Sequence, residues 1–350
     1  MFGTYKPEDV TVLLKDITGL VKPQSTEERE RLIQSGRHYC EMLPIEYEPS
    51  EKYMQAFFQA MELYSAMTAE SVGRLAQQIY EEKGDRTVLV SLARAGTPVG
   101  ILLKRYLKAK YGFEPAHYTV SIIRGRGIDK NAMKYILDRH SPQDLQFVDG
   151  WTGKGAISRV LDEAMKDFPG VSAGLAVLSD PAQLSEKCGT HDDFLIASSC
   201  LNSTVSGLLS RTFLRSDIIS ENDFHGAAFY RELMPKDLTY TFIERIERDF
   251  DYKEYKKEDI KISSGSAYEE VQGICNDFGI RDVNLVKPSI GEATRVLLRR
   301  LPWKVLVHSL DDSEHLGHLY RLAEEKGVEL IEYPLRHYRA CGLIKDLADN

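Results

Sequence analysis

The stretch Leu145-Gln-Phe-Val-Asp-Gly-Trp-Thr-Gly-Lys-Gly155 decides the predicted fold. It begins as an apolar strand that ends in an acid, Asp149, continues as a glycine-rich loop, and leads into a predicted helix from about Ala156 to Lys166. A glycine loop that enters a helix presents backbone N–H groups and the positive end of the helix dipole. The stretch therefore predicts a βα unit whose loop binds a phosphate monoester.

The side chains of this loop suit a phosphorylated sugar. Thr152 adds a hydroxyl donor, Lys154 adds a positive charge, and Asp149 at the strand tip is placed to accept hydrogen bonds from vicinal hydroxyls. The loop is not a Walker A motif, because Gly155 stands where that motif needs Ser or Thr. It also lacks the spacing of a dinucleotide-binding glycine motif.

Short β-branched runs alternate with helical segments on both sides of this loop. This alternation predicts an α/β fold with a doubly wound parallel sheet, in which ligands bind beyond the carboxyl ends of the strands. The strands are predicted at 87–91, 117–123, 145–149, 174–178 and 194–198, and the helices at 97–110 and 156–166.

The flanking regions complete the predicted organisation. Residues 1–86 form a mostly helical region with an apolar stripe in 50–84, residues 87–262 form the sheet domain, and residues 263–350 form a smaller α/β/α domain. A charged stretch at 249–266 is the expected linker. The small domain has predicted strands at 283–286, 304–309 and 328–333 and helices at 290–300 and 313–326.

Composition narrows the class of protein. The chain has 350 residues, 53 acidic against 45 basic side chains, a net charge of -8, and 43% hydrophobic residues, as in ordinary globular proteins. Its five cysteines include no C-x-x-C pair, which excludes a disulfide framework or zinc knuckle. We find no signal peptide or membrane span, so we expect a cytoplasmic protein without a membrane partner.

Two further loops follow predicted strands. Arg94-Ala-Gly-Thr97 follows the first strand of the sheet, which contains Ser91, and the segment from Ser121 to Asp129 carries Arg124 and Arg126 between glycines. Glycines that flank basic residues are typical of a mobile loop, which can bring positive charge to an anion as a bond breaks.

These three loops, in this order, resemble those of type I phosphoribosyltransferases, which use phosphoribosyl pyrophosphate (PRPP). The resemblance implies a Mg²⁺-dependent transfer of ribose 5-phosphate to a nucleobase-like acceptor. It implies a ribose and phosphate site at Asp149, Gly150, Thr152, Gly153, Lys154 and Gly155, a pyrophosphate site at Ser91, Arg94, Ala95, Gly96 and Thr97, catalysis by Arg124, Arg126 and Asp149, and base contacts from Asn202, Ser203 and Thr204. Gly150 and Gly155 depart from the motif, because they replace an acid and a hydroxyl.

Residues 5–10, 193–212 and 224–232 resemble the bacterial StiP (stress-induced protein) family, which is associated with tellurite-resistance-type stress operons. This resemblance implies a rival function, a cysteine protease with Cys200 as nucleophile and His191 or His225 as base. A non-catalytic nucleotide-binding regulator and a nucleoside or nucleotide phosphorylase are further alternatives.

Residues 287–295, 305–312 and 319–328 resemble the Pelota-type RNA-binding domain. The resemblance implies RNA contacts at Gly291, Glu292, Arg295 and Arg339. Residues 281–350 contain 11 basic and 11 acidic side chains, so their net charge of zero does not favour RNA. His308, His315 and His318 lack an evident carboxylate or thiol partner, and we predict no protein-bound metal. A homodimer is left open.

Overall fold

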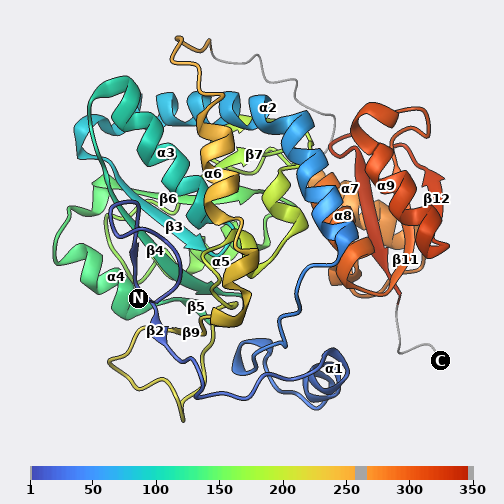
Figure 1. Cartoon of the computed structure of the whole chain (residues 1–350), viewed down its shortest axis with the longest axis horizontal. Helices are drawn as coiled ribbons and strands as arrows, with labels where there is room; N and C mark the ends of the chain where they lie inside the picture. The colour runs from blue at the N-terminus through green and yellow to red at the C-terminus, as the bar shows by residue number, and fades with distance from the viewer. Residues whose placement is uncertain (1, 257–265, 346–350) are drawn as a thin grey trace.

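The computed structural model describes residues 2–256 and 266–345, and its largest element is a mostly parallel β-sheet (Figure 1). The strand order is β1 (Thr11–Val12), β4 (Ala116–Ile123), β3 (Val88–Ala93), β6 (Leu145–Trp151), β7 (Leu175–Ser179) and β8 (Lys187–Thr190). Neighbours along this path are parallel, and β5 (Gly127–Ile128) pairs antiparallel with β4. The predicted α/β class and the parallel sheet are confirmed.

Helices cover both faces of the sheet, because successive residues of a strand point to opposite sides. Leu89 and Val148 pack on the side of α2 (Glu51–Lys83) and α3 (Gly96–Tyr111). Val90 and Phe147 pack on the other side, with α4 (Lys130–Leu137) and α5 (Ala156–Met165). Burial on both faces explains why these strands are continuously apolar.

Helix α2 follows the predicted apolar stripe and runs along one side of the sheet (Figure 1), where it contacts β8. Contact between the two is close at Gly189, where a Cβ would lie 2.4 Å from the backbone oxygen of Ser71. Only glycine leaves room for that approach. Helix α6 (Thr239–Glu247) packs on the same side of the sheet, against α2 and α3.

The N-terminal region is less helical than predicted. It contains α1 (Thr26–Gln34), but β1 extends the central sheet and β2 (Lys15–Asp16) pairs with β9 (Gly226–Ala227). Short 3-10 helices connect the longer elements, at Tyr39–Glu41, Gly84–Arg86, Pro142–Asp144, Ala197–Cys200, Ser203–Val205, Arg231–Lys236 and Val283–Leu285.

The fifth strand of the sheet was predicted in the wrong place. Residues 194–198 form no strand; Phe194, Leu195 and Ile196 are instead buried in the core beside α2, with the ring of Phe194 6.0 Å from that of Tyr64. The edge strand is β8, whose sequence Lys-Cys-Gly-Thr has no strand pattern. The apolar run at 194–198 therefore reflects burial in the core and not pairing in the sheet.

The C-terminal part has its own sheet, in the order β10 (Val286–Pro288), β13 (Ala340–Ile344), β11 (Pro302–Val307) and β12 (Glu329–Glu332). Its helices are α7 (Ala267–Asp277), α8 (Ile290–Arg299) and α9 (Ser313–Lys326). The strand predicted at 283–286 begins only at Val286, and α7 and β13 were not predicted. Much of the predicted linker, 257–265, lies outside the described residues.

A buried carboxylate joins the two parts of the chain. Asp193 is 4% exposed and accepts hydrogen bonds from the backbone N–H groups of Ile290 (3.0 Å) and Arg339 (2.9 Å). Ile290 is the first residue of α8, so the carboxylate also faces the positive end of that helix. This contact joins the small part, which lies beside α2 in Figure 1, to the larger part of the chain.

Candidate active site

The loops after β3 and β6 meet at the carboxyl edge of the sheet, as the sequence predicts. A Cβ at Gly96 would lie 2.3 Å from the backbone oxygen of Val148 and 3.1 Å from the Cα of Asp149. Gly155 adopts a φ of +73° directly before α5, a conformation that favours glycine. The backbone geometry expected of these loops is therefore present.

The polar groups of the phosphate-type loop, however, bind other parts of the protein. Thr152 Oγ1 donates to the carboxylate of Asp180, and Lys154 Nζ donates to the backbone oxygens of Val286 (3.0 Å) and Val283. The hydroxyl of Tyr338 donates to the oxygen of Gly153 at 2.8 Å. The loop thus connects the sheet to the C-terminal part.

Two residues expected to bind pyrophosphate are also committed to internal contacts. Ser91 Oγ lies 2.7 Å from His117 Nε2, and Thr97 Oγ1 lies 2.7 Å from Thr119 Oγ1, all in the buried layer between strands and helix. Beside them, Ala95 precedes the first turn of α3.

Arginine side chains gather near the residues expected to contact a base. Arg94 and Arg299 both donate to Asn202 Oδ1. Ser203 donates through its N–H and its hydroxyl to Glu46 Oε1, at 3.0 and 2.9 Å, and Thr204 is buried. Burial, together with the charges of Arg295 and Arg94, lowers the pKa of Arg299 to about 9.

The basic loop between β4 and β5 contacts the N-terminal region. The backbone N–H of Arg124 donates to Tyr39 Oη at 2.9 Å, and the guanidinium of Arg126 pairs with Glu41 at 3.1 Å. At the tip of β6, Asp149 Oδ1 accepts from the N–H of Gly150, while burial raises the pKa of its carboxyl to about 7.

Among the described residues, no hydrogen bond joins Cys200 to His191 or His225, the bases expected for it. Cys200 is fully buried, and burial raises the pKa of its thiol to about 12, so it does not ionise near neutral pH. His225 Nδ1 instead lies 2.8 Å from Ser121 Oγ. Among the described residues, hydrogen-bonding contacts between cysteine and histidine occur at two other places.

The more accessible of these pairs is Cys188 with His191. Cys188 lies on the edge strand β8 and is partly exposed, and its Sγ is 3.5 Å from His191 Nε2. His191 Nδ1 is 2.9 Å from the backbone oxygen of Asp180, to which it donates. That bond leaves Nε2 unprotonated, the tautomer that a general base needs. The sulfur lies beside the ring, 3.8 Å from Nδ1 as well as 3.5 Å from Nε2.

Asp180 completes this cluster at the end of β7. Its buried carboxylate lies within 4.8 Å of the sulfur of Cys188 and a ring nitrogen of His191. Backbone N–H groups of Leu184 (3.1 Å) and Ser185 (2.8 Å) hold the carboxylate in place. The turn between β7 and β8 therefore brings a thiol, an imidazole and a carboxylate together at the sheet edge. We refer to these three residues as the Cys188 cluster.

The second pair is Cys40 with His38. Cys40 Sγ lies 2.9 Å from His38 Nδ1, but Cys40 is fully buried and burial raises the pKa of its thiol. A substrate cannot reach this sulfur unless the surrounding structure moves. The Cys188 cluster is therefore the better candidate for thiol chemistry.

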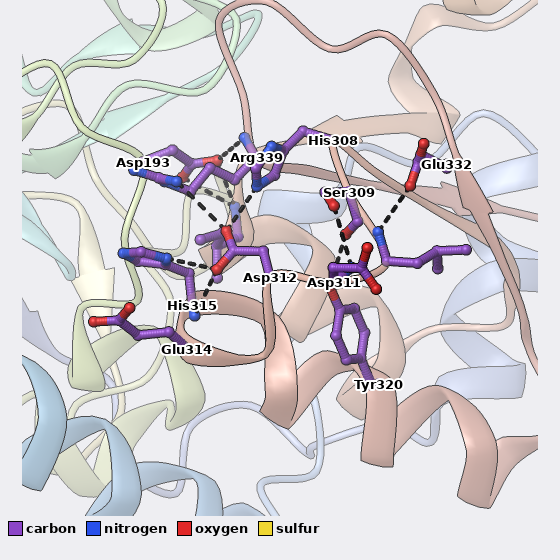
Figure 2. Close-up of polar contacts among 12 residues, drawn as sticks. Asp193, His308, Ser309, Asp311, Asp312, Glu314, His315, Tyr320, Glu332 and Arg339 are labelled. Atoms are coloured by element: carbon purple, nitrogen blue, oxygen red, sulfur yellow. Dashed lines mark hydrogen bonds and ion pairs between the residues drawn. The ribbon is translucent and has the colours of Figure 1, made fainter.

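The residues expected to bind RNA lie at the junction with the large sheet. Gly291 is buried beside Ser199, and the guanidinium of Arg295 lies 5.7 Å from the ring of Trp151. Glu292 donates its backbone N–H to Ser289, and Arg339 contributes its N–H to Asp193 (Figure 2). The larger part of the chain therefore covers much of this surface.

Close to this junction, Asp312 lies between His308 and His315 (Figure 2). One carboxylate oxygen is 2.7 Å from His308 Nε2 and the other is 2.7 Å from His315 Nδ1. Burial raises the pKa of Asp312, but these hydrogen bonds outweigh it and lower the pKa to about 2. This carboxylate partner was not predicted from the sequence. His318 is separate, since it is buried against Thr294.

Fold and site together define an α/β protein with a thiol–imidazole–carboxylate cluster at a sheet edge and a small appended α/β domain. The family described as "Tellurite-like stress resistance cysteine protease StiP" matches residues 3–247, and the "PELOTA RNA binding domain" matches residues 265–346. The chain belongs to the StiP family, and the resemblances to the StiP family and to the Pelota domain are confirmed.

A relative supports the same assignment along the whole chain. The "Cysteine protease StiP" of Acinetobacter baylyi is 36% identical over 365 residues, covering 99% of this chain and 94% of the relative. These findings indicate an enzyme.

Two solved structures resemble part of the chain weakly. A hypoxanthine-guanine phosphoribosyltransferase from Bacillus anthracis aligns with a TM-score of 0.28 and 16% identity, over 36% of this chain and 77% of the other. A xanthine-guanine-hypoxanthine phosphoribosyltransferase from Helicobacter pylori aligns with a TM-score of 0.24 and 15% identity, over 41% and 81%. Scores this low carry no argument about fold or activity.

The predicted phosphoribosyltransferase function is therefore wrong, and with it the description of the chain as a PRPP- and magnesium-dependent transferase. The family and the Acinetobacter relative are both named for cysteine protease activity. The structure agrees with this correction, because Thr152 and Lys154 bind protein groups at the place where a phosphate was expected. No helix within residues 2–256 and 266–345 is both long and apolar enough to span a membrane.

Proposed function

We propose that this chain is a cysteine protease with Cys188 as its nucleophile and His191 as its general base. The observation that carries this proposal is the 3.5 Å contact between Cys188 Sγ and His191 Nε2, with Nδ1 held by the backbone oxygen of Asp180. The names of the family and of the Acinetobacter relative support the reaction class.

The geometry supports a two-step hydrolysis. The thiol proton of Cys188 passes to His191 Nε2, and the thiolate attacks the carbonyl carbon of a peptide bond. The imidazolium then returns the proton to the departing amine, which leaves an acyl-thioester on Cys188. Water, deprotonated by the same imidazole, hydrolyses the thioester and restores the thiol. The carboxylate of Asp180 stabilises the transient imidazolium.

The first test is the reactivity of the thiols in the intact chain. The purified protein is treated briefly with iodoacetamide, and the labelled cysteines are identified by peptide mapping. We expect Cys188 to react at least about tenfold faster than Cys200, because an accessible thiol beside an imidazole ionises more readily than a buried one. His191→Gln should slow the labelling of Cys188 while leaving the other cysteines unchanged. Equal labelling rates for Cys188 and Cys200 would argue against this nucleophile.

We propose further that the C-terminal domain binds RNA, which the match to the Pelota domain over residues 265–346 supports. Arg295 and Arg339 are the arginines expected at that surface. Their placement at the junction implies that RNA contacts them fully only when the junction opens.

This proposal predicts a salt-dependent RNA interaction. A structured RNA hairpin and a single-stranded RNA of equal length are titrated with the full chain in a gel-shift assay. We expect the affinity to fall by at least about tenfold between about 50 and about 200 mM salt, and Arg295→Ala to weaken it. Lys326→Ala, an exposed cation at the end of α9, serves as the control. Binding that Arg295→Ala leaves unchanged would place the RNA elsewhere.

A further inference from the structure

The three side chains of the Cys188 cluster are also a set of metal ligands. Each offers one donor atom of a different kind, a sulfur, an imidazole nitrogen and a carboxylate oxygen, and the three atoms lie within 4.8 Å of one another. We propose that Cys188, His191 and Asp180 bind a thiophilic divalent cation of the Zn²⁺ type, which blocks the nucleophile. The inhibitory role rests on the proposed protease function, whereas the binding itself does not.

The spacing of the sulfur and the imidazole nitrogen equals that of two ligands in a tetrahedral site. Zinc binds sulfur at about 2.3 Å and imidazole nitrogen at about 2.0–2.1 Å, so two such ligands at a tetrahedral angle lie about 3.5 Å apart. The distance between Cys188 Sγ and His191 Nε2 is 3.5 Å. The sulfur also lies 3.8 Å from Nδ1, so the thiol must move from beside the ring toward the Nε2 lone pair before the two ligands share one ion. The carboxylate lies within 4.8 Å of both donor atoms and completes the set.

The surrounding hydrogen bonds orient the ligands as a metal site requires. A ligating histidine commonly donates its second ring N–H to a backbone carbonyl, and His191 Nδ1 donates in this way to Asp180 at 2.9 Å. The carboxylate of Asp180 is held by the N–H groups of Leu184 and Ser185 and by the hydroxyl of Thr152. The partial exposure of Cys188 and His191 provides a path for the ion.

The donor set selects the kind of ion. A thiolate with an imidazole favours Zn²⁺ or Co²⁺, whereas Mg²⁺ and Ca²⁺ prefer ligands made of oxygen alone. Binding releases the thiol proton of Cys188 to solvent as the sulfur–metal bond forms. Three protein ligands leave a fourth position for water, so the bound ion stays exchangeable and no redox step is involved.

The histidines around Asp312 do not form a comparable site. Their nitrogens point at the same carboxylate and already bind it, and the guanidinium of Arg339 lies 3.5 Å from one of its oxygens (Figure 2). A cation there would face a fixed positive charge. The Cys188 cluster contains no such opposing group among its three residues.

The test uses Co²⁺, whose bonds to thiolate are visible by absorption. The reduced full-length protein is titrated with Co²⁺, and Zn²⁺ is then added as a competitor. We expect a thiolate-to-cobalt charge-transfer band that saturates at one equivalent, disappears on adding Zn²⁺, and is absent in Cys188→Ser and His191→Ala. Cys40→Ser, in the other cysteine–histidine pair, is the control and should keep the band. Circular dichroism confirms that each variant is folded.

Either of two results overturns the site: no band in the wild-type protein, or a band that survives in Cys188→Ser. The measurement does not depend on peptidase activity, so the two proposals can fail separately. A cobalt band without any peptidase activity would retain the metal site and reject the protease. Cys188-dependent peptidase activity without a cobalt band would retain the protease and reject the metal site. Inhibition of the peptidase by Zn²⁺ over the concentration range in which Zn²⁺ displaces the bound Co²⁺ supports both proposals.

Discussion

Replacing Cys188 by alanine should lower kcat/KM for a fluorescent protein substrate by at least about 1000-fold, because the attacking sulfur is removed. Replacing His191 by alanine should cause a similar loss, since the pair acts as one unit and their effects are not additive. The double variant should therefore be no less active than either single variant. Activity is measured from initial rates with the full chain under reducing conditions.

The controls for this experiment are variants of the two other cysteines that were considered as nucleophiles. Cys200→Ala and Cys40→Ala should each retain activity within about threefold, because both sulfurs are fully buried. Measurements are made well below the unfolding temperature of each variant, so that a modest loss of core packing does not appear as a loss of catalysis. If Cys188→Ala keeps its activity while Cys200→Ala loses it, the Cys188 cluster is not the active site.

Replacing Asp193 by alanine should lower the free energy of unfolding by about 2–4 kcal/mol, because two backbone N–H groups lose their acceptor in a buried junction. These are the N–H groups of Ile290 and Arg339, bonded at 3.0 and 2.9 Å. The loss falls where the two parts of the chain meet, so urea unfolding of the variant should also become less cooperative. The measurement is equilibrium urea unfolding followed by fluorescence and circular dichroism.

This difference should depend on pH. Burial raises the pKa of Asp193 from 3.8 to about 7, although the N–H groups of Arg339 and Ile290 oppose that shift. A raised pKa means that the folded protein holds a proton which the unfolded chain releases near pH 4, so the stabilisation is greatest at low pH and decreases as the pH rises through about 7. The gap between wild type and Asp193→Ala should therefore be larger at about pH 5 than at about pH 8.

The matched control is the neighbouring carboxylate. Asp192 is exposed, and Asp192→Ala should change the free energy of unfolding by no more than about 0.5 kcal/mol at either pH. A loss in Asp193→Ala no larger than that of the control would mean that the junction does not depend on this carboxylate.

Much of the fold could be predicted because local patterns report burial directly. The apolar stripe of residues 50–84 became α2, the run at 145–149 became most of β6, and residues 313–326 became α9. The strand β8 could not be found in this way, because Lys187-Cys-Gly-Thr190 has neither alternation nor β-branched runs. It pairs because α2 and β7 leave an open edge beside it, which is a property of the packed structure.

The candidate site was also only partly predictable from the sequence. The spacing Cys188-Gly-Thr-His191 was present in the sequence and could have indicated a thiol beside an imidazole, but Cys200 lay in a more distinctive block. Asp312 was likewise overlooked between His308 and His315. In both cases the sequence shows the types of the residues, but it does not show which side chains are accessible or which of them ionise.

Hydrophobic periodicity and short motifs are local properties, so the α/β class, the parallel sheet, most helices and the family could be predicted from the sequence. The polar groups that are already occupied, and the thiol that is accessible, became known only from the packed structure. It turned Thr152 and Lys154 inward to Asp180 and Val286, buried Cys200, and placed Cys188 beside His191 at an edge. Hydrogen-bond partners and burial depend on residues far apart in the chain, so no local pattern specifies them.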